Sequence, residues 1–196
     1  MIFLKAPRVG TVKTRLAASL GAEQACAAYK RLVEILLSDL ATIGEVELRF
    51  TPDDARAEVE HWVRPNWCAA SQGDGDLGCR LKRAFAEAFA SGARRVVIIG
   101  SDCPEVTVDD IRGAWEKLDA SDVVLGPATD GGYWLVGLRA PQPALFNDIA
   151  WSVSSVLSET LQRCRAAGLS VQMLRELIDV DTEADWRRFL ALNHGA

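Results

Sequence analysis

Basic side chains around a proline–glycine loop open the chain and carry the first chemical signal. No acidic residue lies between Met1 and Ala22, so this end of an otherwise acidic chain has a positive field. A loop that bends before a helix turns free backbone N–H groups toward a ligand, and cations beside it favour phosphate. The P-loop pattern GxxxxGKS or GxxxxGKT is absent, and a solvated basic helix start stays open as an alternative. The basic residues are Lys5, Arg8, Lys13 and Arg15, and the candidate phosphate-binding residues are Pro7, Gly10, Lys13 and Arg15.

Acidic residues follow two apolar stretches that lie far apart in the sequence. Asp102 comes after Gly100 and the uniformly apolar run 96–99, which is typical of a strand buried on both faces of a parallel sheet. Asp179 and Asp181 lie near the end of the chain. Ligands collect beyond the carboxyl ends of such strands, and carboxylates suit Mg²⁺ or Mn²⁺ when phosphate and water complete the coordination. The alternatives are an Asx turn at Asp102 and a helix N-terminal cap around Asp179 and Asp181.

A glycine pair marks a third candidate segment, Asp130-Gly131-Gly132-Tyr133-Trp134. Glycines let the backbone approach a ligand closely, and the neighbouring Asp130 could orient a sugar hydroxyl or act as a base. Asp130 is therefore the candidate catalytic residue, and Gly131, Gly132 and Tyr133 are candidate substrate-binding residues. A tight turn before a buried Tyr-Trp strand is the competing interpretation. Trp134 and Trp151 lie on segments that could flank a base.

The segment from Gln72 to Arg80 is a fourth candidate, because its glycines predict a loop that leads into a helix. We interpret Gln72 and Asp76 as substrate contacts and Arg80, in the first helical turn, as a phosphate contact. A mobile substrate lid and an ordinary surface loop are both compatible with this pattern.

Composition excludes several classes of function. The 196 residues carry a net charge of −5, with charges of both signs scattered, which offers no general attraction for nucleic acid or an anionic membrane. Five cysteines without a CxxC pair, and two histidines, do not form the spacing of a zinc or iron–sulfur site. No apolar run approaches the roughly 18 residues of a membrane span. We expect a soluble, cytoplasmic protein with reduced thiols.

Strand-like and helix-like segments alternate along the chain, with short connections. Strands are predicted over 2–4, 46–50, 67–70, 96–100, 122–126, 133–138 and 171–174, and helices over 22–40, 53–63, 77–91 and 154–167. Capping boxes begin further helices at Thr107 with Asp110 and at Thr182 with Asp185. The pattern predicts a single α/β domain, residues 1–196, with a largely parallel sheet.

Five ordered blocks of the sequence resemble those of the DUF2064 family, a group of bacterial proteins similar to glycosyltransferases of the GT-A type. The resemblance extends over about residues 1 to 190. More distantly, the chain is similar to molybdenum-cofactor guanylyltransferases and phospholactate guanylyltransferases. The blocks are Lys5 to Leu16 (KAPRVGTVKTRL), Gln72 to Arg80, Gly100 to Pro104, Leu125 to Tyr133 and Asp179 to Thr182.

The resemblance implies a three-layer α/β/α fold with a mostly parallel mixed sheet of about seven strands, the nucleotide-diphospho-sugar transferase fold. By matching blocks, Lys13 and Arg15 would hold nucleotide phosphates, Asp102 would bind Mg²⁺ or Mn²⁺, and Asp181 would complete the metal site. Two departures stand out. The DxD motif of glycosyltransferases is reduced to Ser101-Asp102-Cys103, and the double-glycine loop of nucleotidyltransferases is replaced by the loop at Pro7 and Gly10.

These features predict a metal-dependent glycosyltransferase that uses a nucleotide-diphospho-sugar and an unidentified small-molecule acceptor. The alternative is a nucleotidyltransferase that joins an NTP to a phosphorylated small molecule and releases pyrophosphate. A non-catalytic nucleotide-sugar-binding protein is a third hypothesis. The first two differ in their product, because one frees a nucleoside diphosphate and the other pyrophosphate.

Overall fold

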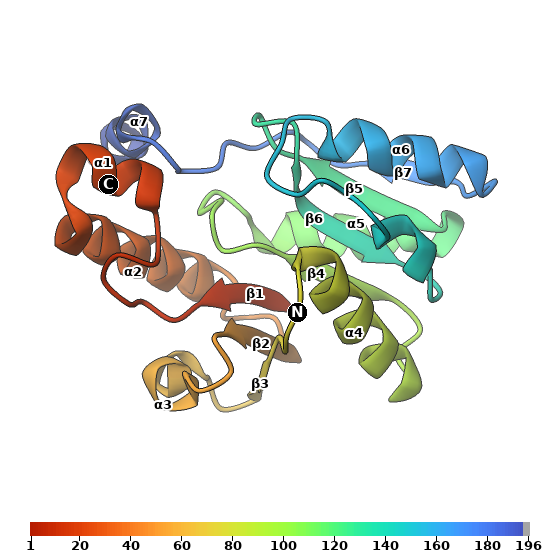
Figure 1. Ribbon diagram of the computed structural model, residues 1–196. Helices are drawn as coiled ribbons and strands as arrows, with labels where there is room; N and C mark the ends of the chain where they lie inside the picture. The colour runs from red at the N-terminus through yellow and green to blue at the C-terminus, as the bar shows by residue number, and fades with distance from the viewer. Residues whose placement is uncertain (194–196) are drawn as a thin grey trace.

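A single seven-stranded sheet runs through the computed structural model, which describes residues 1–193 (Figure 1). The strand order is β3-β2-β1-β4-β6-β5-β7, and β6 alone runs antiparallel to its neighbours. This confirms the predicted mostly parallel mixed sheet. The strands are β1 (Ile2–Lys5), β2 (Val46–Thr51), β3 (Trp67–Ser71), β4 (Val96–Ile99), β5 (Val123–Pro127), β6 (Tyr133–Leu138) and β7 (Val171–Met173).

The helices follow the predicted positions, with one correction. Residues 53–55 belong to a turn in which the Ala55 N–H donates to Pro52 O, so the predicted helix over 53–63 shrinks to α3 and a 3-10 turn. The capping box at Thr107 and Asp110 is confirmed. The helices are α1 (Thr14–Leu20), α2 (Ala22–Asp39), α3 (Arg56–Val59), η1 (Glu60–Trp62), α4 (Leu77–Ala90), α5 (Val108–Ala120), η2 (Pro143–Phe146), α6 (Val156–Ala166) and α7 (Glu183–Asn193).

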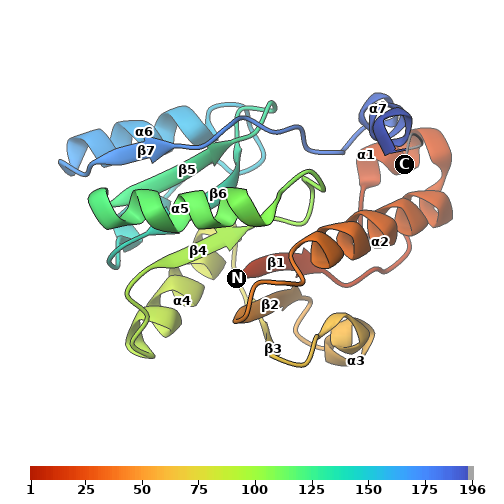
Figure 2. The same ribbon diagram turned by 180° about the vertical axis from the view of Figure 1, so that it is seen from behind.

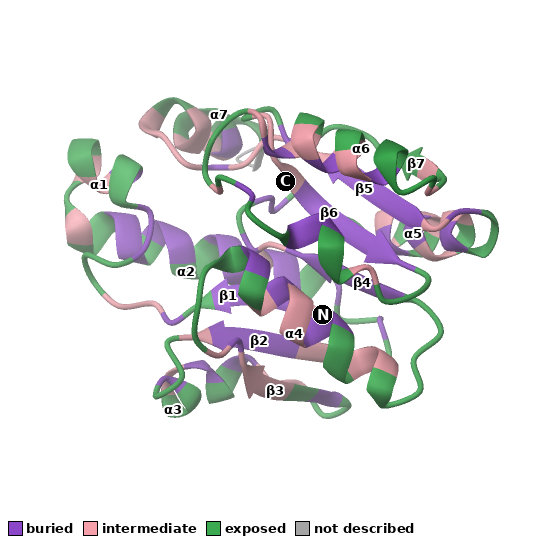
Figure 3. Cartoon of the chain, turned by 45° about the vertical axis from the view of Figure 1, so that its right-hand side comes forward, coloured by how far each residue is buried: buried purple, intermediate pink, exposed green. Residues whose placement is uncertain are grey.

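Helices cover both faces of the sheet, which gives three layers. Alternate residues of a strand point to opposite faces, so the apolar run of β4 supplies both cores. Val97 and Ile99 pack with α2 and α5, whereas Val96 and Ile98 pack with α4 and α6. Figures 1 and 2 show these helix pairs on opposite sides, and Figure 3 shows the buried strands between them. The uniform apolar character of the run follows from this double burial.

The C-terminal helix α7 returns to the N-terminal part of the chain and packs on α2 beside α1 (Figures 1 and 2). Phe189 is buried against Leu32 of α2, and Trp186 packs against α1 and α2. The predicted cap of α7 is confirmed, because Thr182 N donates to Asp185 Oδ2 at 2.8 Å and Asp185 N to Thr182 Oγ1 at 3.3 Å. This packing carries Asp181 to the N-terminal basic loop.

A pocket lies at the opposite edge of the sheet, where the parallel strands begin. A cavity of about 890 Å³ lies beside the amino ends of β1, β2, β3 and β4, and Trp67 and Trp115 contribute to its wall. None of the candidate site residues lines it. Among residues 1–193, no helix has both the length and the apolar character needed to cross a membrane.

Candidate active site at the carboxyl edge of the sheet

Three loops and the C-terminal tail meet where the parallel strands end. The basic loop follows β1, Asp102 follows β4, and the turn at Asp130 precedes the antiparallel β6 and so reaches the same edge. Thr129 N donates to Leu177 O at 3.1 Å, and Val180 N donates to Asp102 O at 2.9 Å, so the tail is attached to both acidic loops. The topology therefore brings together residues that are distant in sequence.

Lys13 lies at the centre of this edge, between two carboxylates. Its ammonium donates to Asp102 Oδ1 and, at 2.9 Å, to Asp181 Oδ1. The Lys13 side chain is 2% exposed, and its backbone is left-handed with φ 48°. Burial alone would lower the pKa of Lys13, but the charges of Asp102 and Asp181 outweigh burial and the net pKa is raised. Lys13 is thus a buried, charged group, and the two predicted metal ligands face the same point.

The other predicted phosphate contacts surround Lys13 in a more open setting. Arg15 is 67% exposed, with Nη1 3.8 Å from Asp181 Oδ2. Gly10 has φ +82° with open space around its Cα, and Pro7 O accepts from the Cys26 thiol at 3.0 Å. Arg8, in contrast, pairs with Glu58 and Asp54 and ties the basic loop to α3. Of the four basic residues of this end of the chain, Arg15 and Lys5 are exposed, and Arg15 is the exposed one that lies beside Asp181.

Tyr29 of α2 is a site residue that sequence reasoning missed. Its buried hydroxyl accepts from Lys5 N at 2.8 Å and lies 3.1 Å from Lys5 O and 3.2 Å from Ser101 Oγ. Burial raises the pKa of Tyr29 to about 12, so the hydroxyl stays neutral. The only available signal was a hydroxyl-bearing aromatic within the apolar stripe of a helix. Tyr29 connects the end of β1 to the residue before Asp102.

Tyr29→Phe is expected to destabilise the protein by about 1–3 kcal/mol, because the Lys5 N–H would lose its buried acceptor. Urea unfolding of both proteins measures this difference. Ser101→Ala is the matched control: it removes the other hydroxyl of the pair but leaves the bond from Lys5 N intact, and it should cost less than Tyr29→Phe. Equal losses for the two variants would contradict this role of Tyr29.

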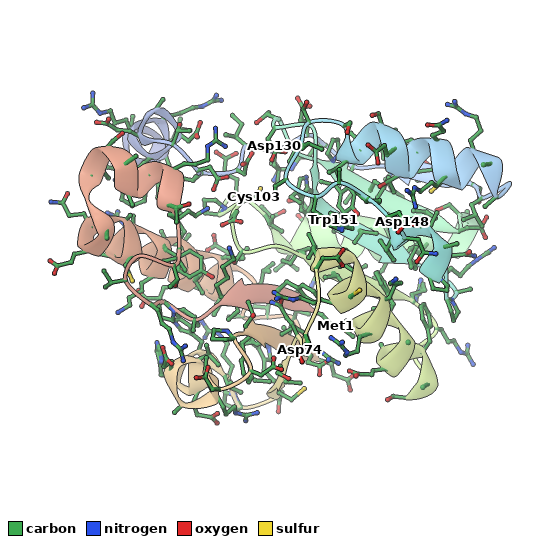
Figure 4. The ribbon with its side chains drawn as sticks, viewed as in Figure 1. Met1, Asp74, Cys103, Asp130, Asp148 and Trp151 are labelled. Atoms are coloured by element: carbon green, nitrogen blue, oxygen red, sulfur yellow. The ribbon has the colours of Figure 1, made fainter. Side chains whose placement is uncertain are left out.

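Two further acids crowd the same edge. Asp130 Oδ1 accepts from Gly132 N at 2.8 Å, and Gly131 has φ +89°, so the predicted tight turn is present. Burial, followed by the negative charges of Asp130 and Asp181, raises the pKa of Asp179 to about 6. Figure 4 shows Asp130 near Cys103, with Trp151 beside the start of α4. This edge of the sheet is therefore rich in carboxylates.

Cys103, the residue after Asp102, does not add a ligand. It is 3% exposed, and burial raises the pKa of its thiol well above its ordinary value. A neutral, buried thiol is a poor ligand for Mg²⁺ or Mn²⁺. Asp102 is therefore the one anionic side chain that the 101–103 segment provides.

The segment from Gln72 to Arg80 is held by its own side chains. Gln72 is buried, and its amide donates to Leu4 O and Arg49 O. Asp76 accepts from Cys79 N at 2.8 Å and caps α4, while Arg80 Nε donates to Gly75 O at 2.9 Å. These three predicted ligand contacts thus have structural partners within and beside the loop, and the geometry gives no direct link to the strand-end acids.

The aromatic residues that were predicted to contact a ligand also differ in how far they are buried. Trp134 is 4% exposed and donates to Arg175 O at 3.1 Å, so it cannot flank a base. Tyr133, predicted to bind substrate, packs edge-on against Trp151 with ring centroids 6.5 Å apart. Trp151 is half-buried and is the aromatic of this group that can border a ligand.

The donor set fits a divalent cation only in part. Asp102 and Asp181 converge on one point, as a shared cation requires. Within residues 1–193, no three His, Cys, Asp or Glu side chains gather to hold a metal. Mg²⁺ accepts this arrangement when phosphate and water supply the remaining oxygens.

Comparison with known proteins defines the class. The chain matches the crystal structure titled "putative nucleotide-diphospho-sugar transferase" from Desulfovibrio desulfuricans G20 with a TM-score of 0.92 and 34% identity, over 100% of this chain and 87% of that one. The fold is therefore that of the nucleotide-diphospho-sugar transferases. The chain belongs to the family described as "Uncharacterized protein conserved in bacteria (DUF2064)", which matches residues 37–153. The resemblance inferred from the sequence blocks is confirmed.

Two further relatives bear on the reaction and on the fold. The phosphoenolpyruvate guanylyltransferase of Sphaerobacter thermophilus is 28% identical over 182 residues, which cover 91% of this chain and 86% of that protein. Rv0371c of Mycobacterium tuberculosis H37Rv, solved in complex with manganese, shares the fold with a TM-score of 0.54 and 16% identity, over 97% of this chain and 95% of that one. The guanylyltransferase relative and the Desulfovibrio structure support a transferase, and Rv0371c shows the shared fold.

Proposed function

We propose that this protein is a nucleotidyltransferase that joins an NTP to a phosphorylated small molecule and releases pyrophosphate. The observation that carries the proposal is the convergence of Asp102 and Asp181 on the buried Lys13, beside the exposed Arg15. Two carboxylates and two cations suit a triphosphate with its metal. The guanylyltransferase relative supports the same reaction class and makes GTP and phosphoenolpyruvate the first substrates to test.

We assign the acidic and the basic residues of the site different roles. Asp102 and Asp181 would hold Mg²⁺ or Mn²⁺, which when bound neutralises the phosphates and the departing pyrophosphate. Arg15 would bind a phosphate from the solvent side. An oxygen of the acceptor phosphate attacks the α-phosphorus, and the bond from that phosphorus to the β-phosphate oxygen breaks. An ionised phosphate needs no base, so this reaction requires no proton acceptor among the side chains.

Nucleotidyl transfer is favoured over the predicted glycosyl transfer by the residues on either side of Asp102. A DxD motif that included Asp102 would need a second acid at position 100 or 104, and these positions hold Gly100 and Pro104. The more distant resemblance to guanylyltransferases implies a strand-end Asp near a Pro at the metal site, and Asp102 and Pro104 fit that description.

Glycosyl transfer is the second candidate, and Asp130 is the observation that favours it. The Asp130 side chain is exposed, and its Oδ1 accepts a hydrogen bond from Gly132 N, which leaves Oδ2 available to accept a proton from a hydroxyl. Glycosyl transfer to an alcohol needs such a base. The name of the Desulfovibrio protein supports the same reaction.

A thermal-shift screen followed by product analysis tests the proposal. NTPs and nucleotide-diphospho-sugars are added with and without Mn²⁺, and a ligand at about 100 times its Kd should raise the melting temperature by about 5 °C or more. GTP with phosphoenolpyruvate should then yield pyrophosphate. Free nucleoside diphosphate from a nucleotide-diphospho-sugar would favour glycosyl transfer. A shift without turnover would indicate a binding protein, and no metal-dependent shift would contradict both enzyme proposals.

Asp130→Asn separates the two reactions. It should leave pyrophosphate release within about fivefold of wild type if the acceptor is a phosphate, because no base is needed. It should lower glycosyl transfer about a hundredfold or more if Asp130 is the base.

A further inference from the structure

The ammonium of Lys13 occupies the place where a cation bridging Asp102 and Asp181 would bind. Both carboxylates direct an oxygen to the same nitrogen, and the Lys13 side chain is 2% exposed. Arg15 reaches Asp181 only from the solvent side, at 3.8 Å. The ligand-free site is therefore already filled by a positive charge that belongs to the chain.

Resting on the proposed function, we propose that the Lys13 ammonium and the divalent metal compete for the same position between Asp102 and Asp181. The ammonium must leave this position before the metal can bind there. An incoming phosphate supplies the anion that the displaced ammonium needs. The metal and the nucleotide then bind with positive coupling, and the free protein binds the metal weakly.

The backbone around Lys13 is compatible with a side chain that moves from the two carboxylates to a bound phosphate. Lys13 is the residue before α1 and has left-handed geometry, φ 48° and ψ 47°, which costs free energy in a residue other than glycine. Its neighbour in the loop, Gly10, has open space around it. An ammonium that left the two carboxylates but stayed buried would carry a large desolvation cost unless another anion received it. Phosphate is the anion that the surrounding cations select.

Mn²⁺ titration followed by electron paramagnetic resonance tests the competition directly, without turnover. Wild-type protein should bind Mn²⁺ alone weakly, and GTP should tighten this binding tenfold or more. Lys13→Met should bind Mn²⁺ alone at least tenfold more tightly than wild type, and GTP should tighten its binding by a smaller factor than in wild type, because only direct coordination by phosphate remains. Arg15→Met is the matched control, because it removes one positive charge beside the same Asp181; it should change the affinity for Mn²⁺ alone less than threefold.

The outcomes separate this inference from the function on which it rests. If Lys13→Met binds Mn²⁺ no more tightly than wild type while GTP still tightens Mn²⁺ binding to both, the inference is overturned and the proposed function stands. If no NTP changes Mn²⁺ binding to wild type, the proposed function fails. Tighter Mn²⁺ binding to Lys13→Met in that case would still support the competition.

Lysine acetylation of the wild-type protein provides a second measurement, which does not depend on how the variant folds. In the metal-free protein, Lys13 should be acetylated at least tenfold more slowly than the exposed Lys30. Saturating Mn²⁺ should raise the Lys13 rate threefold or more and leave the Lys30 rate unchanged. Mass spectrometry of the labelled peptides gives both rates. An unchanged Lys13 rate at saturating Mn²⁺ would overturn the inference.

Discussion

Asp102→Asn is expected to remove the metal-dependent thermal shift with nucleotide and to lower the turnover rate by about two to three orders of magnitude, as loss of one strong charge-stabilising group does. Asp102 is the anionic side chain of the 101–103 segment, and the backbone at this residue also anchors the tail through Val180 N. An amide keeps the shape but removes the charge that a metal and Lys13 both need. Pyrophosphate release and the Mn²⁺-dependent melting temperature measure the two effects.

The control for Asp102→Asn is Asp109→Asn on α5. The Asp109 side chain is 92% exposed and pairs only loosely with Arg112, at 3.6 Å. Asp109→Asn removes the same charge as Asp102→Asn and lies nearby in the sequence. Pyrophosphate release and the Mn²⁺-dependent melting temperature of this control should therefore stay near wild-type values. If Asp102→Asn retained the metal-dependent shift while the protein remained folded, Asp102 would not be a metal ligand.

Gly131→Ala is expected to destabilise the protein by about 2–5 kcal/mol, because two costs add. The residue has φ +89°, which an L side chain rarely adopts, and an added Cβ would lie 2.2 Å from Ser154 O. That oxygen belongs to backbone, so it cannot move aside cheaply. The turn would have to open, and the bond from Leu157 N to Gly131 O at 2.9 Å, at the start of α6, would be strained.

Gly92→Ala isolates the conformational cost of Gly131→Ala. Gly92 has φ +92° and no atom within 4 Å of an added Cβ, so its replacement should cost only about 1 kcal/mol. Urea unfolding of the two variants gives the comparison. The excess loss in Gly131→Ala measures the contact between the Asp130 turn and the segment before α6. Equal losses would mean that this segment yields to the added atom.

Local sequence was sufficient for much of the architecture. The uniformly apolar run of β4 predicted burial on both faces, and the structure places Val97 and Val96 in the two separate cores. Helix caps at Thr107 and Thr182 were equally readable, because a cap is satisfied within four residues. The short α3 was misjudged because a turn at Pro52 replaces the first helical turn.

The sequence did not predict which side chains of the candidate site already have hydrogen-bond partners within the protein. Asp76 and Gln72 were interpreted as ligand contacts, but the structure engages Asp76 in capping α4 and Gln72 in hydrogen bonds to Leu4 and Arg49. Trp134 was interpreted as a possible neighbour of a base and is buried. Residue type shows what a side chain is able to do, whereas the packing around it decides whether that capacity is already used.

The sequence by itself determined most of the elements, the position of Lys13 in the loop before a helix, the position of Asp102 after a strand, and the family to which the chain belongs. These depend on hydrophobic periodicity and on short motifs, both of which are local. Only the tertiary structure decided that Lys13 lies between Asp102 and Asp181, which are 89 and 168 residues away. That arrangement depends on the packing of α7 against α1 and α2, a long-range contact that no local pattern encodes.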